Sequence, residues 1–134
     1  MNETQFGAKF QQWWGVYKPC KIAALEYKVT NTNTFNLTNW RKKQPLQEIK
    51  LRDANSSKGV IWKISDLDPR TKPFDAFFIS DAPAFLVIWY GKYDTFFMIP
   101  VKEIPKQTSI SYKYCCLRFI PYKLLKIIKP HYEI

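Results

Sequence analysis

An acidic and a basic residue stand two positions apart in an otherwise apolar stretch, and this spacing could support chemistry. Glu26 and Lys28 fall within residues 21–30, whose β-branched and aromatic members predict a buried strand. Residues i and i+2 of a strand share a face, so the two charges project side by side. Two interpretations stay open. The pair either marks an edge strand with one solvated face or a site where Glu26 binds a divalent metal and Lys28 holds an anion or a water.

Further polar residues stand near this pair in the sequence, and each has an ordinary structural role available to it. Asp75 enters an apolar strand, where it could accept hydrogen bonds from the preceding loop. Gln44 could cap a helix, and Glu3 could compensate the dipole of the first helix. Asp66 could cap the loop after its strand.

Composition favours a polyanionic partner. The chain has 134 residues and a formal charge of +10, which points first to nucleic acid and second to an acidic membrane surface. Three cysteines with a single histidine give neither a disulfide framework nor zinc spacing, so we expect reduced thiols in a cytosolic protein. No apolar run approaches the roughly 18 residues of a membrane span, and we expect no signal peptide.

The pattern of apolar residues predicts one domain of class α/β (mixed α+β), in which helices flank a mixed β-sheet. A helix is predicted over 3–14, with an Asn2/Gln5 capping box and a stop at Gly15. A turn opened by Thr38 or Asn39 leads to Pro45, which either kinks a helix or begins the one predicted to end near Ala54. We expect both helices to pack on strand 21–30, placed centrally in the sheet.

The second half of the chain predicts mainly strands. They cover 60–64, 74–79, 84–90, 95–101 and 110–120, and the segment 80–83 is the most hairpin-like connection. Residues 105–134 form a basic, aromatic C-terminal extension. The apolar residues within 122–129 indicate that this short segment packs on the domain or forms a homodimer contact, and it is too short for an independent membrane anchor.

The motifs together resemble the PD-(D/E)XK nuclease superfamily, and within it small Holliday junction resolvase-like proteins of phages and microbes. Residues 26–28 resemble its (D/E)-x-K motif, and residues 73–75 resemble a variant of its Pro-Asp motif. Residues 35–44 resemble the stretch that leads to a helix-opening His-Gln, with Lys43 in place of the histidine. The Pro-Asp strand here follows the Glu-x-Lys strand, whereas it commonly precedes it, which implies a rearranged member.

The resemblance implies a restriction-endonuclease-like sheet and metal-dependent hydrolysis of DNA phosphodiesters, including junction resolution. Asp75, Glu26 and the main-chain carbonyl of Tyr27 would hold Mg²⁺ or Mn²⁺. Lys28 would hold the water or the phosphate, Gln44 would orient them, and Glu3 would act through a water. Asp66 would be a competing metal ligand. The alternative is a non-catalytic nucleic-acid-binding protein on the same fold.

Binding to DNA would draw on lysine and arginine side chains outside this centre. The candidates are Arg41, Lys42 and Lys43, at the start of the second helix, and Lys72 in the loop before Asp75. We expect a cytoplasmic protein of microbial or phage origin.

Overall fold

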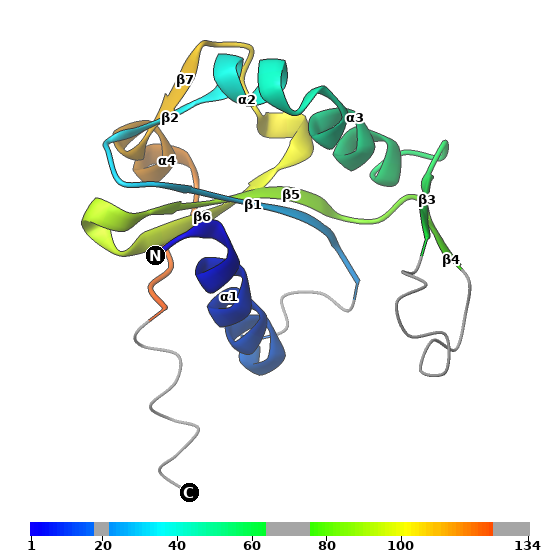
Figure 1. The fold of residues 1–134 in the computed structure, drawn as a ribbon, viewed down its shortest axis with the longest axis horizontal. Coiled ribbons are helices and arrows are strands. Elements are labelled where there is room, and N and C mark those ends of the chain that lie inside the picture. The colour runs from blue at the N-terminus through cyan, green and yellow to red at the C-terminus, as the bar shows by residue number, and fades with distance from the viewer. Residues whose placement is uncertain (18–21, 64–75, 125–134) are drawn as a thin grey trace, which may run out of the picture.

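The computed structural model describes residues 1–17, 22–63 and 76–124, which form a mixed sheet with helices on both sides (Figure 1). The elements are, in chain order, α1 (Glu3–Tyr17), β1 (Ala24–Thr30), β2 (Thr34–Asn36), α2 (Leu37–Lys43), α3 (Pro45–Ala54), β3 (Val60–Lys63), β4 (Ala76–Ile79), β5 (Ala84–Tyr90), η1 (Gly91–Tyr93), β6 (Thr95–Pro100), η2 (Val101–Glu103), β7 (Ser109–Ser111) and α4 (Tyr112–Arg118). The predicted fold class, helices flanking a mixed sheet, is confirmed.

The main sheet has the strand order β1-β5-β6. β1 runs parallel to β5, with Glu26 opposite Leu86 and Lys28 opposite Ile88, and β6 is antiparallel to β5. Within the described residues β1 therefore lies at the edge of the sheet, and the prediction that it is central was wrong. β5 holds the centre because its side chains are apolar on both faces, so neither face needs water.

Two cores cover the two faces of this sheet. Phe6, Phe10 and Trp13 of α1 pack against Val87 and Phe96 on one face. On the other face, residues of α2, α3 and α4 pack against alternate residues of β5, including Leu86, Ile88 and Tyr90. Each fully buried aromatic or aliphatic side chain contributes about 1.5–3 kcal/mol, so both helix layers are held mainly by apolar contact.

The first helix begins as predicted and ends later. Asn2 Oδ1 accepts from the Gln5 N–H at 2.8 Å, and Gln5 Oε1 accepts from the Asn2 N–H at 3.0 Å, which is the predicted capping box. Gly15 does not stop the helix, which continues to Tyr17. A glycine in a helix interior costs only about 1 kcal/mol relative to alanine, so a helix whose preceding turns pack in a core can continue beyond it.

The bend between α2 and α3 follows from Pro45. Asn36, rather than Thr38 or Asn39, caps α2, because its side chain accepts from the Asn39 N–H at 2.8 Å. α2 ends at Lys43 and Pro45 takes the first turn of α3, where its missing N–H has no cost. Of the two predictions for this proline, a helix start is confirmed.

Two predictions for the later strands were wrong. β4 does not pair with β5 but forms an antiparallel hairpin with β3. Between β4 and β5 the chain is bound to the end of α3, since Asp81 donates its N–H to Ser56 O and Ala82 donates to Ala54 O. The predicted strand over 110–120 is β7 followed by α4, because Ser111 caps the helix by accepting from the Tyr114 N–H.

The described part of segment 122–129 packs on the domain, which is one of the two alternatives predicted for it. Tyr122 pairs with Phe96 of β6 through two backbone hydrogen bonds of 2.9 and 3.0 Å. Leu124 is buried in the same core as α1.

Candidate active site on the edge strand

Glu26 and Lys28 meet on one face of β1, as their spacing predicts. Lys28 Nζ lies 3.2 Å from Glu26 Oε1, and the Lys28 side chain is only 12% exposed. The opposite face carries Leu25, Tyr27 and Val29 against α1. The pair is thus on an edge strand, as one interpretation of the sequence had it, but its face is largely covered.

A second carboxylate reaches the same ammonium from α1. Glu3 Oε1 lies 3.5 Å from Lys28 Nζ, and the Glu3 side chain is 49% exposed. The edge position of β1 lets the lysine reach an acidic residue from the helix layer beyond the sheet. Glu3, Glu26 and Lys28 therefore form one cluster of two negative charges around one positive charge.

The surroundings change the acidity of Glu26. Burial raises the pKa of its carboxyl above the ordinary value of 4.5, and the nearby Glu3 charge raises it further. The Lys28 ammonium lowers it but does not cancel the effect of burial. A partly buried carboxylate whose charge is incompletely compensated is suited to accept a further cation.

Two depressions flank this cluster and define where a ligand could approach. The Glu26 groove has a volume of about 630 Å³ and lies between β1, α3 and the β3–β4 hairpin, with Ala24, Glu26, Gln47, Lys50, Leu51 and Trp62 among its lining residues. The Lys28 hollow, about 440 Å³, is lined by residues that include Lys28, Thr30, Thr32, Asn39, Lys43 and Gln44.

Gln44, one of the predicted site residues, lines the same hollow as Lys28. It sits between α2 and α3 and is exposed, and its side chain makes no capping hydrogen bond. The amide is consequently available to a ligand. Lys43 lines the same hollow, so a cation of the basic run faces the candidate site.

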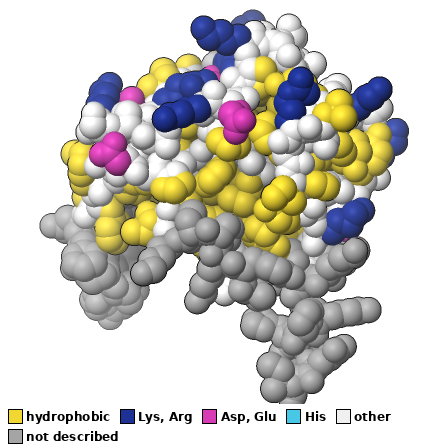
Figure 2. Space-filling view, turned by 180° about the vertical axis from the view of Figure 1, so that it is seen from behind, with side chains coloured by type: hydrophobic (Ala, Val, Ile, Leu, Met, Phe, Trp, Pro, Cys, Tyr) yellow, Lys and Arg dark blue, Asp and Glu magenta, His cyan; other side chains and the backbone are white. Residues whose placement is uncertain are grey.

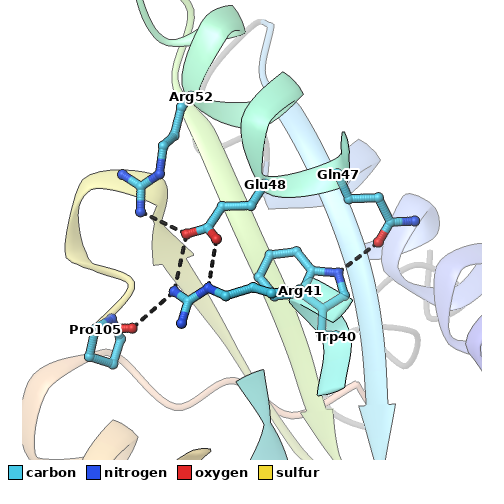
Figure 3. A network of polar contacts seen from close by, with 6 residues as sticks. All are labelled: Trp40, Arg41, Gln47, Glu48, Arg52 and Pro105. Carbon is cyan, nitrogen blue, oxygen red and sulfur yellow. Dashed lines mark hydrogen bonds and ion pairs between the residues drawn. The ribbon is translucent and has the colours of Figure 1, made fainter. Parts of the chain in front are cut away.

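Arg41, Lys42 and Lys43 lie in the last turn of α2, so the prediction that they stand at the start of a helix was wrong. Arg41 also has a different role from its two neighbours. Its guanidinium donates to both carboxylate oxygens of Glu48, at 2.7 and 3.2 Å, and to Pro105 O at 3.0 Å (Figure 3). Arg52 donates to the same carboxylate at 2.7 Å. The Arg41 hydrogen bond, its strongest influence, lowers the pKa of Glu48. Arg41 therefore clamps α2, α3 and the segment after η2 together, whereas Lys42 and Lys43 are exposed.

A hydrogen bond beside this clamp connects the two depressions. Trp40, which lines the Lys28 hollow, donates its indole N–H to Oε1 of Gln47, which lines the Glu26 groove, at 2.7 Å. This bond joins α2 to α3, so it fixes the walls that the two helices contribute to the hollow and the groove.

Several predicted site residues fall outside the described residues. These are Asp66, Lys72 and Asp75, so their approach to Glu26 stays a prediction, as does metal binding by the carbonyl of Tyr27. In the part of the chain that the structure describes, no three His, Cys, Asp or Glu side chains come together as a metal site. Mg²⁺ prefers oxygen ligands, and among the described residues the carboxylates at the cluster are those of Glu3 and Glu26.

Neither a protein-family model, nor a curated protein, nor a solved structure matches this chain.

Several residues that line the two depressions were not predicted from the sequence. Gln47, Lys50, Leu51 and Ala54 lie along one side of α3 at helical spacing, a pattern that could have placed them beside β1. Thr30, Thr32 and Thr34 alternate along the chain and face the Lys28 hollow. No local signal predicted Trp62, because the groove exists only once β3 folds back beside α3.

Positive charge spreads over elements next to the site. Exposed lysines and arginines occur on α2, α3 and η2, namely Lys42, Lys43, Lys50, Arg52 and Lys102. Figure 2 shows dark blue side chains over the upper part of the face seen from behind, above a broad apolar area. Among the described helices, none is long and apolar enough to cross a membrane.

Proposed function

We propose that the chain is a divalent-metal-dependent endonuclease that hydrolyses DNA phosphodiester bonds, with Glu26 and Lys28 at its centre. The observation that carries the proposal is the largely covered Glu26–Lys28 pair, which lies between a groove and a hollow in a protein of charge +10. Nuclease chemistry needs an anion-binding cation beside a carboxylate, and the pair supplies both.

Three groups would hold the metal: the carboxylate of Glu26, the carbonyl of Tyr27 and the carboxylate of Asp75. When bound, Mg²⁺ or Mn²⁺ supplies a water of lowered pKa and neutralises charge on the phosphate. Lys28, on leaving its carboxylate partners, would bind a phosphate oxygen or hold the attacking water. Gln44 and Lys43 would position the phosphate from the other wall of the hollow.

The test is a cleavage and binding assay on branched and linear DNA with Mg²⁺, with Mn²⁺ and with chelator. We expect cleavage only with metal. Glu26→Gln, Asp75→Asn and Lys28→Ala should each lose cleavage while keeping DNA binding, because affinity comes mainly from other lysines and arginines. If Glu26→Gln cleaves DNA as well as wild type does, the assignment of the active site to Glu26 is refuted.

A second function has its own support. Lys28 is held by two carboxylates, and the described residues include only those two acidic side chains at the cluster. A non-catalytic DNA-binding protein on the same fold would have this arrangement. Wild-type protein that binds DNA but cuts no substrate with either metal would establish this alternative. A homodimer, a cytoplasmic location and a microbial or phage origin stay predictions from the sequence.

A further inference from the structure

The β3–β4 hairpin carries large apolar side chains that belong to neither core. Ile61, Trp62 and Phe78 are 68%, 66% and 64% exposed. Ile61 lies opposite Phe78 and Trp62 lies opposite Phe77 in the hairpin register. Because successive strand residues point to opposite faces, both faces of the hairpin present apolar side chains. A concentration of exposed aromatic surface of this kind usually marks a binding surface.

This aromatic surface is continuous with the candidate active site. Residues of β3, including Ile61 and Trp62, form one wall of the Glu26 groove, and Lys50 and Leu51 of α3 form another. Glu26 of β1 lies in the same groove. In Figure 1 the hairpin stands beyond the end of α3, at the side of the molecule. A ligand that contacts the aromatic wall would therefore also come near the carboxylate.

The charge of the groove selects among possible occupants. Two charged side chains line it, Glu26 and Lys50, and the Glu26 carboxylate already lies 3.2 Å from the Lys28 ammonium, which leaves the Lys50 charge for a ligand. Further exposed cations of α2 and η2 lie on elements that contact α3. A purely apolar partner would leave these charges without a counterpart. A DNA strand with unpaired bases offers flat apolar rings for the aromatic wall and phosphates for the lysines. In an intact duplex the flat faces of the bases are covered by their neighbours.

We propose that the β3–β4 hairpin and the Glu26 groove bind DNA with unpaired bases, with Trp62 stacking on a base and Lys50 contacting a neighbouring phosphate. The proposal rests on the proposed function in taking DNA as the partner, and it adds the structural class of DNA. It would direct the enzyme to single strands, gaps and branch points, where bases are free to stack.

The experiment measures binding in chelator, so that cleavage plays no part. Fluorescently labelled single strands and blunt duplexes of equal length are titrated with wild-type protein, Trp62→Ala and Trp62→Phe. We expect wild type to prefer the single strand. Trp62→Ala should weaken single-strand binding roughly tenfold, within the range of about 5- to 150-fold expected for loss of one stacked base. Trp62→Phe should restore most of it, and duplex binding should change little.

Two matched measurements distinguish the loss of a stacked base from a general loss of apolar surface or of folding. Leu117→Ala alters a side chain of α4 that is 74% exposed, and it should leave both affinities unchanged. Single strands should quench the tryptophan emission of wild type, and Trp62→Phe should lose part of that quenching. This second readout does not depend on the folding of Trp62→Ala.

Three outcomes would overturn the proposal. They are unchanged single-strand binding in Trp62→Ala, equal losses on single strand and duplex, or sedimentation showing that wild type is a dimer that Trp62→Ala dissociates. The last result would assign the aromatic surface to a second copy of the chain. If wild type never cuts DNA but Trp62-dependent single-strand binding is found, the nuclease proposal fails and this one stands.

Discussion

Glu26 is subject to opposing influences that make its protonation a property of the fold. Burial and the Glu3 charge raise the pKa of its carboxyl, and the Lys28 ammonium lowers it with a smaller effect. The folded protein therefore binds this proton more tightly than the unfolded chain does. Protonation of Glu26 therefore contributes to the free energy of unfolding. This contribution is fully present below pH 4.5, the ordinary pKa, and is lost as the pH rises through the higher pKa of the folded protein.

Replacing Glu26 with glutamine tests this balance. At neutral pH, Glu26→Gln should melt no lower than wild type and is expected to melt higher, because it removes a carboxylate that is costly to ionise. The difference should shrink as the pH falls toward 4, where wild-type Glu26 becomes protonated. Thermal melts from pH 4 to 8 measure it. Glu3→Gln serves as control, since its more exposed carboxylate should produce a smaller change.

Magnesium should stabilise wild type more than Glu26→Gln. A ligand that binds only the folded state raises its stability in proportion to the logarithm of ligand concentration over Kd. Millimolar Mg²⁺ should therefore raise the melting temperature of wild type more than that of Glu26→Gln. An equal effect of Mg²⁺ on both would place its binding elsewhere.

The α2–α3 bend shows that residue types alone do not tell a structural arginine from a ligand-binding one. Arg41, Lys42 and Lys43 form one basic run in the sequence, and all three were predicted to bind nucleic acid. Only the fold brings Glu48, one helix further along, within hydrogen-bond distance of Arg41. A local run of charges thus predicts a basic surface, but it does not predict which residue of the run forms hydrogen bonds within the fold.

Arg41→Ala should therefore reduce stability more than DNA affinity. It leaves the Glu48 carboxylate with Arg52 alone and frees Pro105 O, so we expect a loss of about 1–3 kcal/mol in the free energy of unfolding. Urea denaturation measures this loss. The control is Arg52→Ala, whose more exposed ion pair within α3 should contribute only about 0.3–0.5 kcal/mol. Equal losses in the two variants would contradict the clamp.

The elements that the sequence predicted well are those defined by their own residues. The aromatic stripe and capping box place the start of α1, and Pro45 places the start of α3. Pairing between strands was harder to predict, since β4 and β5 are adjacent in the sequence yet belong to different sheets. The backbone bonds of Asp81 and Ala82 to the end of α3 decide this separation, and they depend on contacts between distant segments.

In the candidate site, too, local features were predicted from the sequence and contacts between distant segments were not. The spacing of Glu26 and Lys28 correctly predicted two side chains on one face, because a strand has a fixed period. Glu3 and Gln44 were linked to that pair by the resemblance to a nuclease family and not by periodicity, and Lys43 was predicted only as part of the basic run. Gln47, Lys50 and Trp62 were missed, because a groove between three elements has no signal in any one of them.

For the molecule as a whole, the net charge of +10 predicts attraction to DNA without saying where it binds. The structure provides two comparable lysines on opposite sides of the sheet. Lys43 faces the Lys28 hollow, and Lys9 is exposed on α1. Replacing either with alanine changes the net charge by the same amount, so a difference between the two variants reports a local contact rather than overall charge.

Lys43→Ala should weaken DNA binding and lower the slope of log affinity against log salt by about 1, the loss of one phosphate contact. Lys9→Ala should leave the slope unchanged and reduce affinity only slightly, because charges farther than the roughly 10 Å Debye length at 0.1 M salt are largely screened. Fluorescence anisotropy over a range of salt concentrations, with chelator present, gives both slopes. If the two slopes fall equally, DNA is attracted by the whole molecule and has no preferred position over the Lys28 hollow. If Lys43→Ala alone changes the slope, the phosphate backbone passes beside Lys28, which the proposed hydrolysis requires.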